Sequence, residues 1–431
     1  MNSKLSPNQY NLLEDTASQW SSLQQCRAYA PRLFNAEGYQ TRVKHERELW
    51  KYTDSMHLLR FEKNIKKALN GYFTHDEFEV FKSSTERILD FTKNLGKPLL
   101  GHNSNSRAFI CSRILQQLVL KGMLPQKMNV LELGPGSGSQ MAILCDSKFE
   151  KNKGDSSLLG NKFMVENTQA FYLCQNHFFS EYFKDNFIES ASMPFEEINE
   201  ILKSLVDDDH RIMHLPWWHF ANTDFYLPKI DLVIANHMLS EMSVTAFRHT
   251  FNIIFNSNKK IHNCPAPLIL CETWGGDPER QPGVMTDFLR IGYAPIHNRP
   301  LYKAGDRYLN DLAIGLFADP KFVSQKMGME LIFHEKAKEL TPELAKKFDG
   351  KRTYEEILNV FIKNNFRTSM LFSTASILSK AILDIRNEKK GSVPYSSIVK
   401  YMNSIVADKG LGGIDSIDDR FTRDWGYGTV F

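Results

Sequence analysis

Hydrophobic residues in the middle of the chain gather in short runs, and each run ends where glycine or polar residues begin. Continuous apolar runs of this length are typical of parallel strands that are buried on both faces of a sheet. The predicted strands cover residues 130–133, 163–165, 232–235 and 267–271, with late strands at 311–317 and 330–334. Apolar residues at helical spacing follow the first three runs, over residues 140–145, 171–178 and 247–255. This alternation predicts an α/β protein with a doubly wound parallel sheet and right-handed crossovers.

Three alternating glycines, Gly134, Gly136 and Gly138, follow the first predicted strand. Glycine supplies the positive φ angles that a turn from strand to helix requires, and its missing Cβ leaves the backbone open to a ligand. The turn matches neither the NAD fingerprint Gly-x-Gly-x-x-Gly nor the P-loop ending Gly-Lys-Ser/Thr. We therefore predict a small anionic or zwitterionic ligand over this turn, and a glycine-rich turn without a ligand is the alternative.

Together with Glu132, the glycines spell Glu-x-Gly-x-Gly-x-Gly over residues 132–138. This spelling resembles the first motif of class I S-adenosylmethionine-dependent methyltransferases. The resemblance implies a Rossmann-like methyltransferase domain over residues 100–340, with S-adenosyl-L-methionine as the cofactor. It also implies that the methionine part of the cofactor lies against the turn, at Glu132, Gly134, Pro135, Gly136 and Gly138.

An acidic residue at the end of the second strand is expected to accept hydrogen bonds from the ribose hydroxyls of a nucleotide cofactor. Glu166 follows the apolar residues 163–165 and fits this role, although the polar segment 149–161 lengthens the usual spacing. The alternative is that Glu166 is an exposed residue that opens a helix. For the adenine amine, Asn222 or Asp224 is the expected acceptor, and the sequence does not choose between them.

Polar side chains crowd the carboxyl end of the predicted strand 232–235, which is the edge of a parallel sheet where ligands bind. They include Asn236, which we expect beside the cofactor, and also His237 and Glu241. Methyl transfer to a hydroxyl needs a base for its proton, and histidine ordinarily titrates near neutrality. We predict His237 as this base, with Glu241 orienting it or holding a sugar hydroxyl. A histidine hydrogen-bonded within the upper layer of the sheet is the alternative.

Acceptor contacts are predicted from two places further along the chain. Glu272 and Trp274 follow the fourth predicted strand, where a carboxylate can bind hydroxyls and an indole can stack on a sugar face. Residues 275–308 are rich in Gly, Pro, Arg and Tyr, and we expect them to form a lid or specificity loop that carries Arg290 and Tyr293. A purely structural crossover is the alternative for this segment.

Two methyltransferase families resemble this chain beyond the cofactor motif. Residues 236–242, NHMLSEM, and 166–178, ENTQAFYLCQNHF, are similar to strand ends of sugar O-methyltransferases, which implies a small hydroxylated acceptor. The order VLELGPGSG, VEN, WWHF and IANHM also resembles the MidA-type protein arginine methyltransferases, which implies a protein acceptor. The chain departs from that second family at His237, because the acidic Asn-Glu-Phe-x-Asp strand end is missing.

Both ends of the chain are predicted to be helical. Residues 1–99 contain a capping-box spelling at Thr74 and Glu77 ahead of apolar residues at helical spacing, which predicts a helical N-terminal region. Residues 341–431 contain FDGKRTYEEIL, a short stretch that resembles a winged-helix turn of the PqqD-like kind. That resemblance implies peptide binding, and packing or homodimer contacts are the alternative for a small helical domain.

Charge, hydrophobicity and cysteine content indicate which partners and which compartment to expect. With 53 basic and 50 acidic residues the net charge is +3, which gives no electrostatic reason to expect a nucleic acid or a membrane surface as partner. The chain has no apolar run of about 18 residues and no signal-peptide core, so we expect a cytoplasmic protein. Its six cysteines form no Cys-x-x-Cys pair and several lie in apolar runs, which predicts free thiols without a disulfide or a metal site.

Three functions are compatible with these patterns. The first, and our prediction, is O-methylation of a sugar or another small hydroxylated metabolite. The second is methylation of a protein or peptide side chain that the terminal domains hold. The third is a non-catalytic assembly protein that keeps the cofactor pocket.

Overall fold

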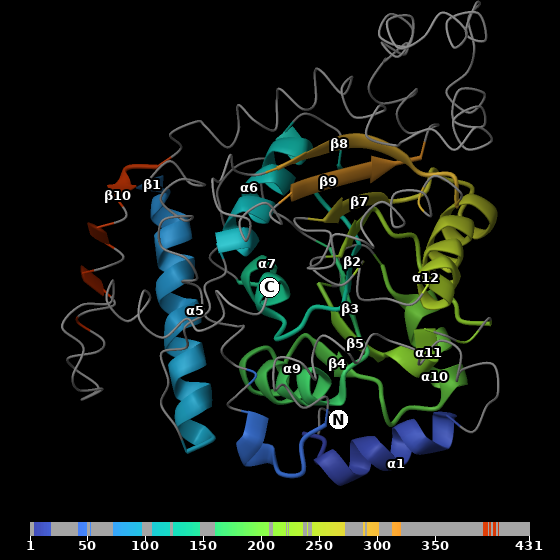
Figure 1. The fold of residues 1–431 in the computed structure, drawn as a ribbon, viewed down its shortest axis with the longest axis horizontal. Helices are drawn as coiled ribbons and strands as arrows, with labels where there is room; N and C mark the ends of the chain where they lie inside the picture. The colour runs from blue at the N-terminus through green and yellow to red at the C-terminus, as the bar shows by residue number, and fades with distance from the viewer. Residues whose placement is uncertain are drawn as a thin grey trace, which may run out of the picture. The chain divides into compact units, whose positions relative to one another are not determined.

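The computed structural model describes a central sheet, the helices around it and parts of both chain ends (Figure 1). The described residues are 4–18, 42–49, 52, 72–96, 106–120, 124–146, 160–206, 210–220, 222, 224–235, 239, 244–271, 288, 291–300, 313–319, 391–394, 396–397, 400–401 and 404. The chain divides into two compact units, residues 1–225 with 384–431 and residues 226–383. The domain boundaries predicted after residues 99 and 340 fall inside these units and stay predictions.

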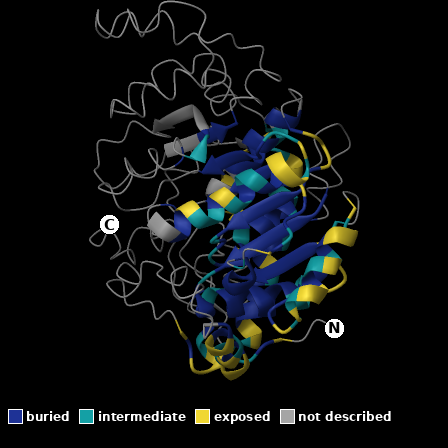
Figure 2. Cartoon of the chain, turned by 90° about the vertical axis from the view of Figure 1, so that its right-hand side faces the viewer, coloured by how far each residue is buried: buried dark blue, intermediate teal, exposed yellow. Residues whose placement is uncertain are grey.

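Four parallel strands form the sheet of the first unit, in the order β4-β5-β3-β2. They are β2 (Val130–Leu133), β3 (Lys162–Glu166), β4 (Phe187–Glu189) and β5 (Ile212–Pro216). β2 and β3 confirm two predicted strands, and all of their residues are buried, as the dark core of Figure 2 shows. The apolar pattern does not predict β4 and β5, because β4 has only three residues and His214 interrupts the apolar run of β5.

The strands of the second unit are β6 (Leu232–Ile234), β7 (Leu268–Cys271), β8 (Ala294–Pro300) and β9 (Ala313–Ala318). β6 and β7 are parallel, whereas β9 pairs antiparallel with both β7 and β8. β6, β7 and β9 confirm predicted strands. β8 lies in the segment predicted as an irregular loop, so that prediction is wrong for residues 294–300, where β8 pairs with β9. The late strand predicted at 330–334 lies outside the described residues.

Hydrogen-bonded neighbours follow the order β4-β5-β3-β2 within the first unit and β6-β7-β9-β8 within the second. In the first unit β3 lies beside β2, and β5 and β4 extend the sheet beyond β3, with helices between successive strands, as in one half of a doubly wound sheet. The antiparallel pair at the β8 end makes the sheet mixed. The predicted α/β, Rossmann-like fold class is confirmed.

Helices surround the strands of the first unit. They are α1 (Pro7–Ser18), α5 (His75–Asn94), α6 (Ser106–Leu120), α7 (Ser139–Leu144), α9 (Gln169–Tyr182), α10 (Phe195–Ser204) and α11 (Trp217–Phe220). α9 packs on β3 and β4, and α1 packs on α9 and α11. α5 and α6 both contact α7, the short helix that follows the glycine turn. In the second unit, α12 (Val244–Asn256) confirms the helix predicted at 247–255, and a π-helical turn (Ser257–Ile261) follows it.

The capping box predicted at Thr74 and Glu77 is present at the start of α5. The Thr74 hydroxyl accepts a hydrogen bond from the Glu77 N–H at 3.1 Å, and Glu77 Oε2 accepts one from the Thr74 N–H at 2.7 Å. The Glu77 carboxylate also pairs with the buried guanidinium of Arg113 in α6. One side chain therefore caps α5 and joins it to α6.

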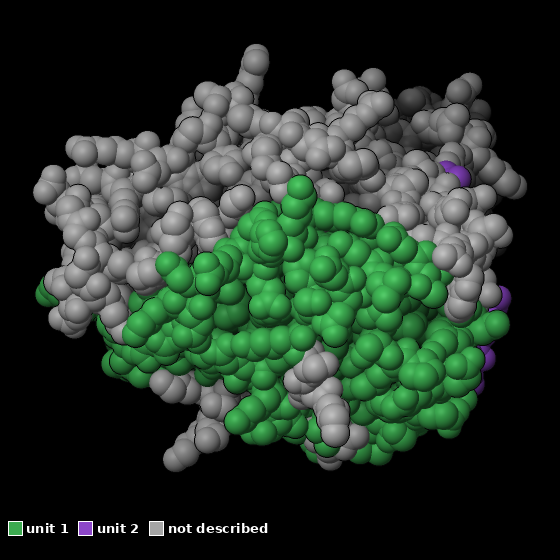
Figure 3. Space-filling view, turned by 90° about the horizontal axis from the view of Figure 1, so that it is seen from below, with its two compact units in different colours: residues 1–225, 384–431 green, residues 226–383 purple. Residues whose placement is uncertain are grey.

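A small two-stranded sheet joins two segments that are far apart in the sequence within the first unit, which is green in Figure 3. β1 (Tyr72–Phe73) pairs antiparallel with β10 (Val393–Pro394). Both strands lie in regions that the sequence predicts to be helical. The helical prediction is therefore wrong for two residues in each region. A strand of two residues is too short to leave a periodic pattern in the sequence.

None of the described helices is long and apolar enough to cross a lipid bilayer. The described part of the chain contains five cysteines, Cys111, Cys145, Cys174, Cys264 and Cys271. Three of them, Cys111, Cys174 and Cys271, are buried. The absence of a disulfide or metal site at the cysteines stays a prediction.

Candidate functional site

The turn after β2 has the backbone that its glycines predict. Gly134, Gly136 and Gly138 have φ angles of 60°, 59° and 81°, all in the left-handed region that favours glycine. Gly138 is the N-cap residue of α7, and a Cβ on it would lie 2.8 Å from the Phe179 ring. A Cβ on Gly136 would meet no described atom within 4 Å. The backbone at Gly136 therefore borders open space that a ligand can fill.

Glu166 ends β3 beside this turn, because β3 pairs in parallel with β2. Its Oε1 accepts hydrogen bonds from the N–H groups of Asn167 and Thr168, both at 2.8 Å. Its Oε2 accepts from the N–H of Gly136 and from the Gln175 amide, both at 3.1 Å. Glu166 is only 2% exposed, so the alternative of an exposed residue opening a helix is wrong.

Glu132 brings a second buried carboxyl group to the turn. Burial raises the pKa of Glu132 to about 8, with a smaller contribution from Glu166 and an opposing hydrogen bond from the backbone of Met141. Burial also raises the pKa of Glu166 to about 7, against the four hydrogen bonds that it accepts. Glu132 Oε2 is buried and accepts no hydrogen bond from any described residue. Among the residues that the structure describes, no positive charge stabilises the ionised form of either carboxyl group.

These features fit S-adenosylmethionine, which carries a sulfonium, an ammonium and a carboxylate group and has a net positive charge. The unpartnered Glu132 Oε2 and the open space at Gly136 suit a cofactor that brings positive charge against a bare backbone. Glu166 fits with one change of partner. Each of its oxygens already accepts two hydrogen bonds, so a ribose hydroxyl at Oε2 has to replace the Gly136 N–H or the Gln175 amide.

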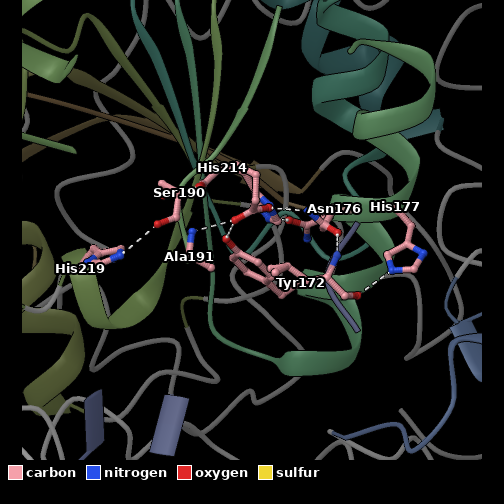
Figure 4. Close-up of polar contacts among 10 residues, drawn as sticks. Tyr172, Asn176, His177, Ser190, Ala191, His214 and His219 are labelled. Carbon is pink, nitrogen blue, oxygen red and sulfur yellow. Dashed lines mark hydrogen bonds and ion pairs between the residues drawn. The ribbon is translucent and has the colours of Figure 1, made fainter. Parts of the chain in front are cut away.

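The predicted site omits a group of buried polar side chains around Tyr172 and His214 (Figure 4), which Gln175 connects to the turn. Gln175 Nε2 donates to the Gly136 carbonyl as well as to the acid at the end of β3, and Gln175 Oε1 lies 2.8 Å from His214 Nε2. His214 Nδ1 lies 2.8 Å from Glu189 Oε2, and the Tyr172 ring stacks on the imidazole at 3.8 Å. The sequence carries one signal of this group, because the polar Gln175 interrupts the apolar face of α9.

Asn222 and Asp224 lie in a turn after α11. The side-chain oxygen of Asn222 accepts a hydrogen bond from the Asp224 N–H at 3.0 Å, and Asp224 is exposed. The choice between them as adenine contact stays a prediction.

Tyr293 is fully buried in the second unit, with its ring edge-on to Phe255 and Phe288 at 5.1 and 5.9 Å. These are the surroundings of a core residue, and its contact with an acceptor stays a prediction. The remaining predicted site residues lie outside the described residues: Asn236, His237, Glu241, Glu272, Trp274 and Arg290.

No known protein family matches this sequence, and no curated protein matches it either. Among solved structures, the chain is similar to a class I S-adenosylmethionine-dependent methyltransferase described from Listeria monocytogenes, at 11% identity and a TM-score of 0.33, covering 71% of this chain and 88% of that one. It is also similar to human N-acetylserotonin methyltransferase in complex with S-adenosylmethionine, at 13% identity and a TM-score of 0.28, covering 70% and 72%. A methyltransferase from Aquifex aeolicus has 13% identity and a TM-score of 0.25, covering 48% and 90%. Likenesses at this level carry no activity over to this chain.

Proposed function

We propose that this protein is an S-adenosylmethionine-dependent methyltransferase. The turn at residues 134–138 carries the proposal, with three left-handed glycines and open space at Gly136. The two buried carboxyl groups of Glu132 and Glu166 suit a ligand that carries positive charge, because such a charge would stabilise their ionised forms. A phosphate over this turn would meet two carboxyl groups instead of a basic residue. The site therefore favours a cationic cofactor over a dinucleotide.

In this proposal the methionine part of the cofactor is held by Glu132, Gly134, Pro135, Gly136 and Gly138. Glu166 holds the ribose hydroxyls by exchanging one of its partners at Oε2. The cofactor supplies a methyl group on a positively charged sulfur, which the protein has only to orient toward an acceptor. On the adenine side we propose Asn222, Asp224 and Asn236.

For the acceptor we propose a sugar or another small hydroxylated metabolite. Support comes from the sequence that follows β6 and β7, because the carboxyl ends of parallel strands share one edge of a sheet. His237 follows β6 and removes the hydroxyl proton, while Glu241 orients His237. The proposed acceptor contacts are Glu272, Trp274, Arg290 and Tyr293.

Isothermal titration with S-adenosylmethionine tests the cofactor, and we expect saturable binding by the wild-type protein. The variant Gly136→Asp should not bind, because the side chain fills the open space and adds a third carboxyl group. Gly96→Asp is the matched control, since Gly96 has a φ of 86°, has no described atom within 4 Å of its would-be Cβ, and lies after α5. A wild-type protein that gives no binding heat contradicts the proposal.

Transfer of a labelled methyl group tests the class of acceptor. S-adenosylmethionine with a labelled methyl group is incubated with the protein and with either a metabolite fraction or a peptide fraction. We expect label in small hydroxylated metabolites. Label confined to peptides would support the protein-methylating alternative instead. The variant His237→Ala should lower kcat by at least about 100-fold, in line with the loss of a general base.

A further inference from the structure

Two segments near the start of the chain pack on elements that begin close to Glu166. α1 packs on α9, which begins three residues after Glu166, and on α11, which begins directly after β5 (Figure 1). The second segment, residues 42–49, is held at the first residue of α9. We call residues 7–18 and 42–49 together the N-terminal strap. Polar contacts hold both of its pieces in place.

The first anchor of the N-terminal strap is Gln169, the first residue of α9. Its Oε1 accepts a hydrogen bond from the Val43 N–H at 2.7 Å, and its Nε2 donates to Asn11 Oδ1 at 2.9 Å and to the Val43 carbonyl at 3.4 Å. The orientation of the amide is fixed, because a backbone N–H can only donate and a backbone carbonyl can only accept. One side chain therefore binds both pieces of the strap.

The second anchor is Trp217, which follows the cross-strand neighbour of Glu166. β3 and β5 pair in parallel, with Glu166 opposite Pro216. The indole N–H of Trp217 donates to Glu14 Oε1 at 3.1 Å, and Arg42 pairs with Glu14 Oε2. The Glu14 carboxylate therefore joins the end of β5 to both pieces of the N-terminal strap.

The two anchors flank Glu166, one along the chain and one across the sheet. Four of the residues in these contacts are at most 5% exposed, which shows that the N-terminal strap packs closely on its anchors: Glu14, Val43, Gln169 and Trp217. The pKa of Tyr10 in α1 supports this position. Burial raises the pKa of Tyr10 well above its ordinary value, and the charges of Glu14 and Glu166 raise it further. α1 therefore lies close to the acid that ends β3.

We propose that the N-terminal strap is the wall of the cofactor site on the side of Glu166, and that it encloses the nucleoside of S-adenosylmethionine. The identity of the ligand rests on the proposed function, whereas the position of the strap rests on its two anchors. A nucleoside whose ribose hydroxyls reach Glu166 lies at the carboxyl ends of β3 and β5. The strap borders this same edge at Gln169 and Trp217. The bound nucleoside and the docked strap are therefore neighbours, and each stabilises the other.

The contacts of the N-terminal strap assign it to the cofactor and not to the acceptor. All of them lie within the first unit, which also contains the glycine turn and Glu166. The proposed acceptor contacts belong to residues 226–383, the second unit.

Hydrogen exchange with and without S-adenosylmethionine tests the wall in the wild-type protein. With saturating cofactor, the amides of residues 42–49 should exchange at least about fivefold slower, because the nucleoside opposes release of the strap. A wild-type protein that binds S-adenosylmethionine while residues 42–49 exchange at an unchanged rate overturns the inference. The proposed function would stand in that case.

Two matched variants separate the wall from general packing. Arg42→Met removes a cationic partner of the buried Glu14, whereas Lys4→Met removes the cationic partner of Glu181, 2.7 Å away. Glu181 lies about 18 Å along α9 from Gln169, at 1.5 Å per residue. Arg42→Met should raise the Kd for S-adenosylmethionine at least about fivefold, and Lys4→Met should stay within about twofold of the wild type. Equal Kd values in the two variants overturn the inference.

The same two variants test the position of the N-terminal strap without any cofactor. In Arg42→Met, the amides of residues 42–49 and 167–172 should exchange at least about fivefold faster than in Lys4→Met, because the strap loosens beside the start of α9. Equal exchange in the two variants overturns the inference. The expected difference, together with a wild type that binds no S-adenosylmethionine, would sink the proposed function and with it the nucleoside, while the docking of the strap beside Glu166 would stand.

Discussion

At the scale of single residues, Gly136 and Gly138 share a left-handed backbone but differ in what surrounds them. Gly138→Ala adds backbone strain and a contact of 2.8 Å with Phe179, so we expect a loss of about 2–3 kcal/mol in the free energy of unfolding. Gly136→Ala adds strain alone and should lose only about 1 kcal/mol. Its new methyl group occupies the open space, so its Kd for S-adenosylmethionine should rise at least about tenfold. Urea denaturation and calorimetric titration measure the two effects.

The control for both glycine variants is Gly96→Ala, with a φ of 86° and open space, after α5. It should lose stability like Gly136→Ala and keep the wild-type affinity. If all three variants bind the cofactor equally well, the open space at Gly136 is not its site.

Glu132 is the residue whose ionisation should couple stability to binding. The ordinary pKa of a glutamate is 4.5, and burial raises the pKa of Glu132 to about 8 in the folded protein. Between pH 4.5 and pH 8 the unfolded chain therefore binds fewer protons than the folded protein. The free energy of unfolding falls as the pH rises through this range. Glu132→Gln removes this penalty and should be more stable than the wild type at pH 8, by on the order of 2 kcal/mol, with little difference at pH 4.5. Denaturation at the two pH values measures this.

The same carboxyl group should make cofactor binding pH-dependent. A cationic ligand binds its ionised form, so wild-type affinity should increase from pH 6 to pH 8 and binding should release protons. Titration in buffers of different ionisation enthalpy detects that release. An affinity that decreases over this range in the wild type, or the same pH dependence in Glu132→Gln, would contradict a role for Glu132 in holding the cation.

At the scale of elements, α5 depends on its first turn. The Thr74 hydroxyl satisfies the Glu77 N–H, and Glu77 in turn bonds the Thr74 N–H and Arg113. Thr74→Ala should therefore lower the free energy of unfolding by about 1 kcal/mol, whereas Thr74→Ser, which keeps the hydroxyl, should stay within about 0.5 kcal/mol of the wild type. Equal losses in the two variants would show that the Thr74 methyl group, and not the cap, stabilises the start of α5.

The elements that the sequence predicts are those whose information is local. β2, the glycine turn and the α5 cap each follow from the order of neighbouring residues, which fixes backbone conformation and burial without reference to the rest of the chain. β4 and β5 depend on pairing across the chain, with Glu189 set beside His214 by the register of the two strands. The group of buried polar side chains from Gln175 to Glu189 exists only after that register forms, so residue type alone did not reveal it.

At the scale of the whole molecule, a segment near residue 400 contacts α5 within the first unit, and a single side chain tests this contact. Tyr401 donates a hydrogen bond to Glu86 of α5 at 3.0 Å, and its ring lies edge-on to Phe78 and Phe81 at 6.1 and 6.2 Å. Tyr401→Ala removes the ring and the hydrogen bond, and should lower the free energy of unfolding by about 2 kcal/mol.

Tyr401→Phe separates the two contributions, because it keeps the ring contacts and loses only the hydroxyl. It should lose about 1 kcal/mol or less. Hydrogen exchange shows where the effect of Tyr401→Ala lies. The amides of residues 75–94 should exchange faster, because the Tyr401 side chain forms hydrogen bonds and ring contacts with α5. The amides of the glycine turn should exchange at the wild-type rate. Unchanged exchange in α5 would mean that residues 391–404 do not pack on this helix in solution. The pairing of β1 with β10 would then lose its main support, because two residue pairs are too few to form a stable sheet alone.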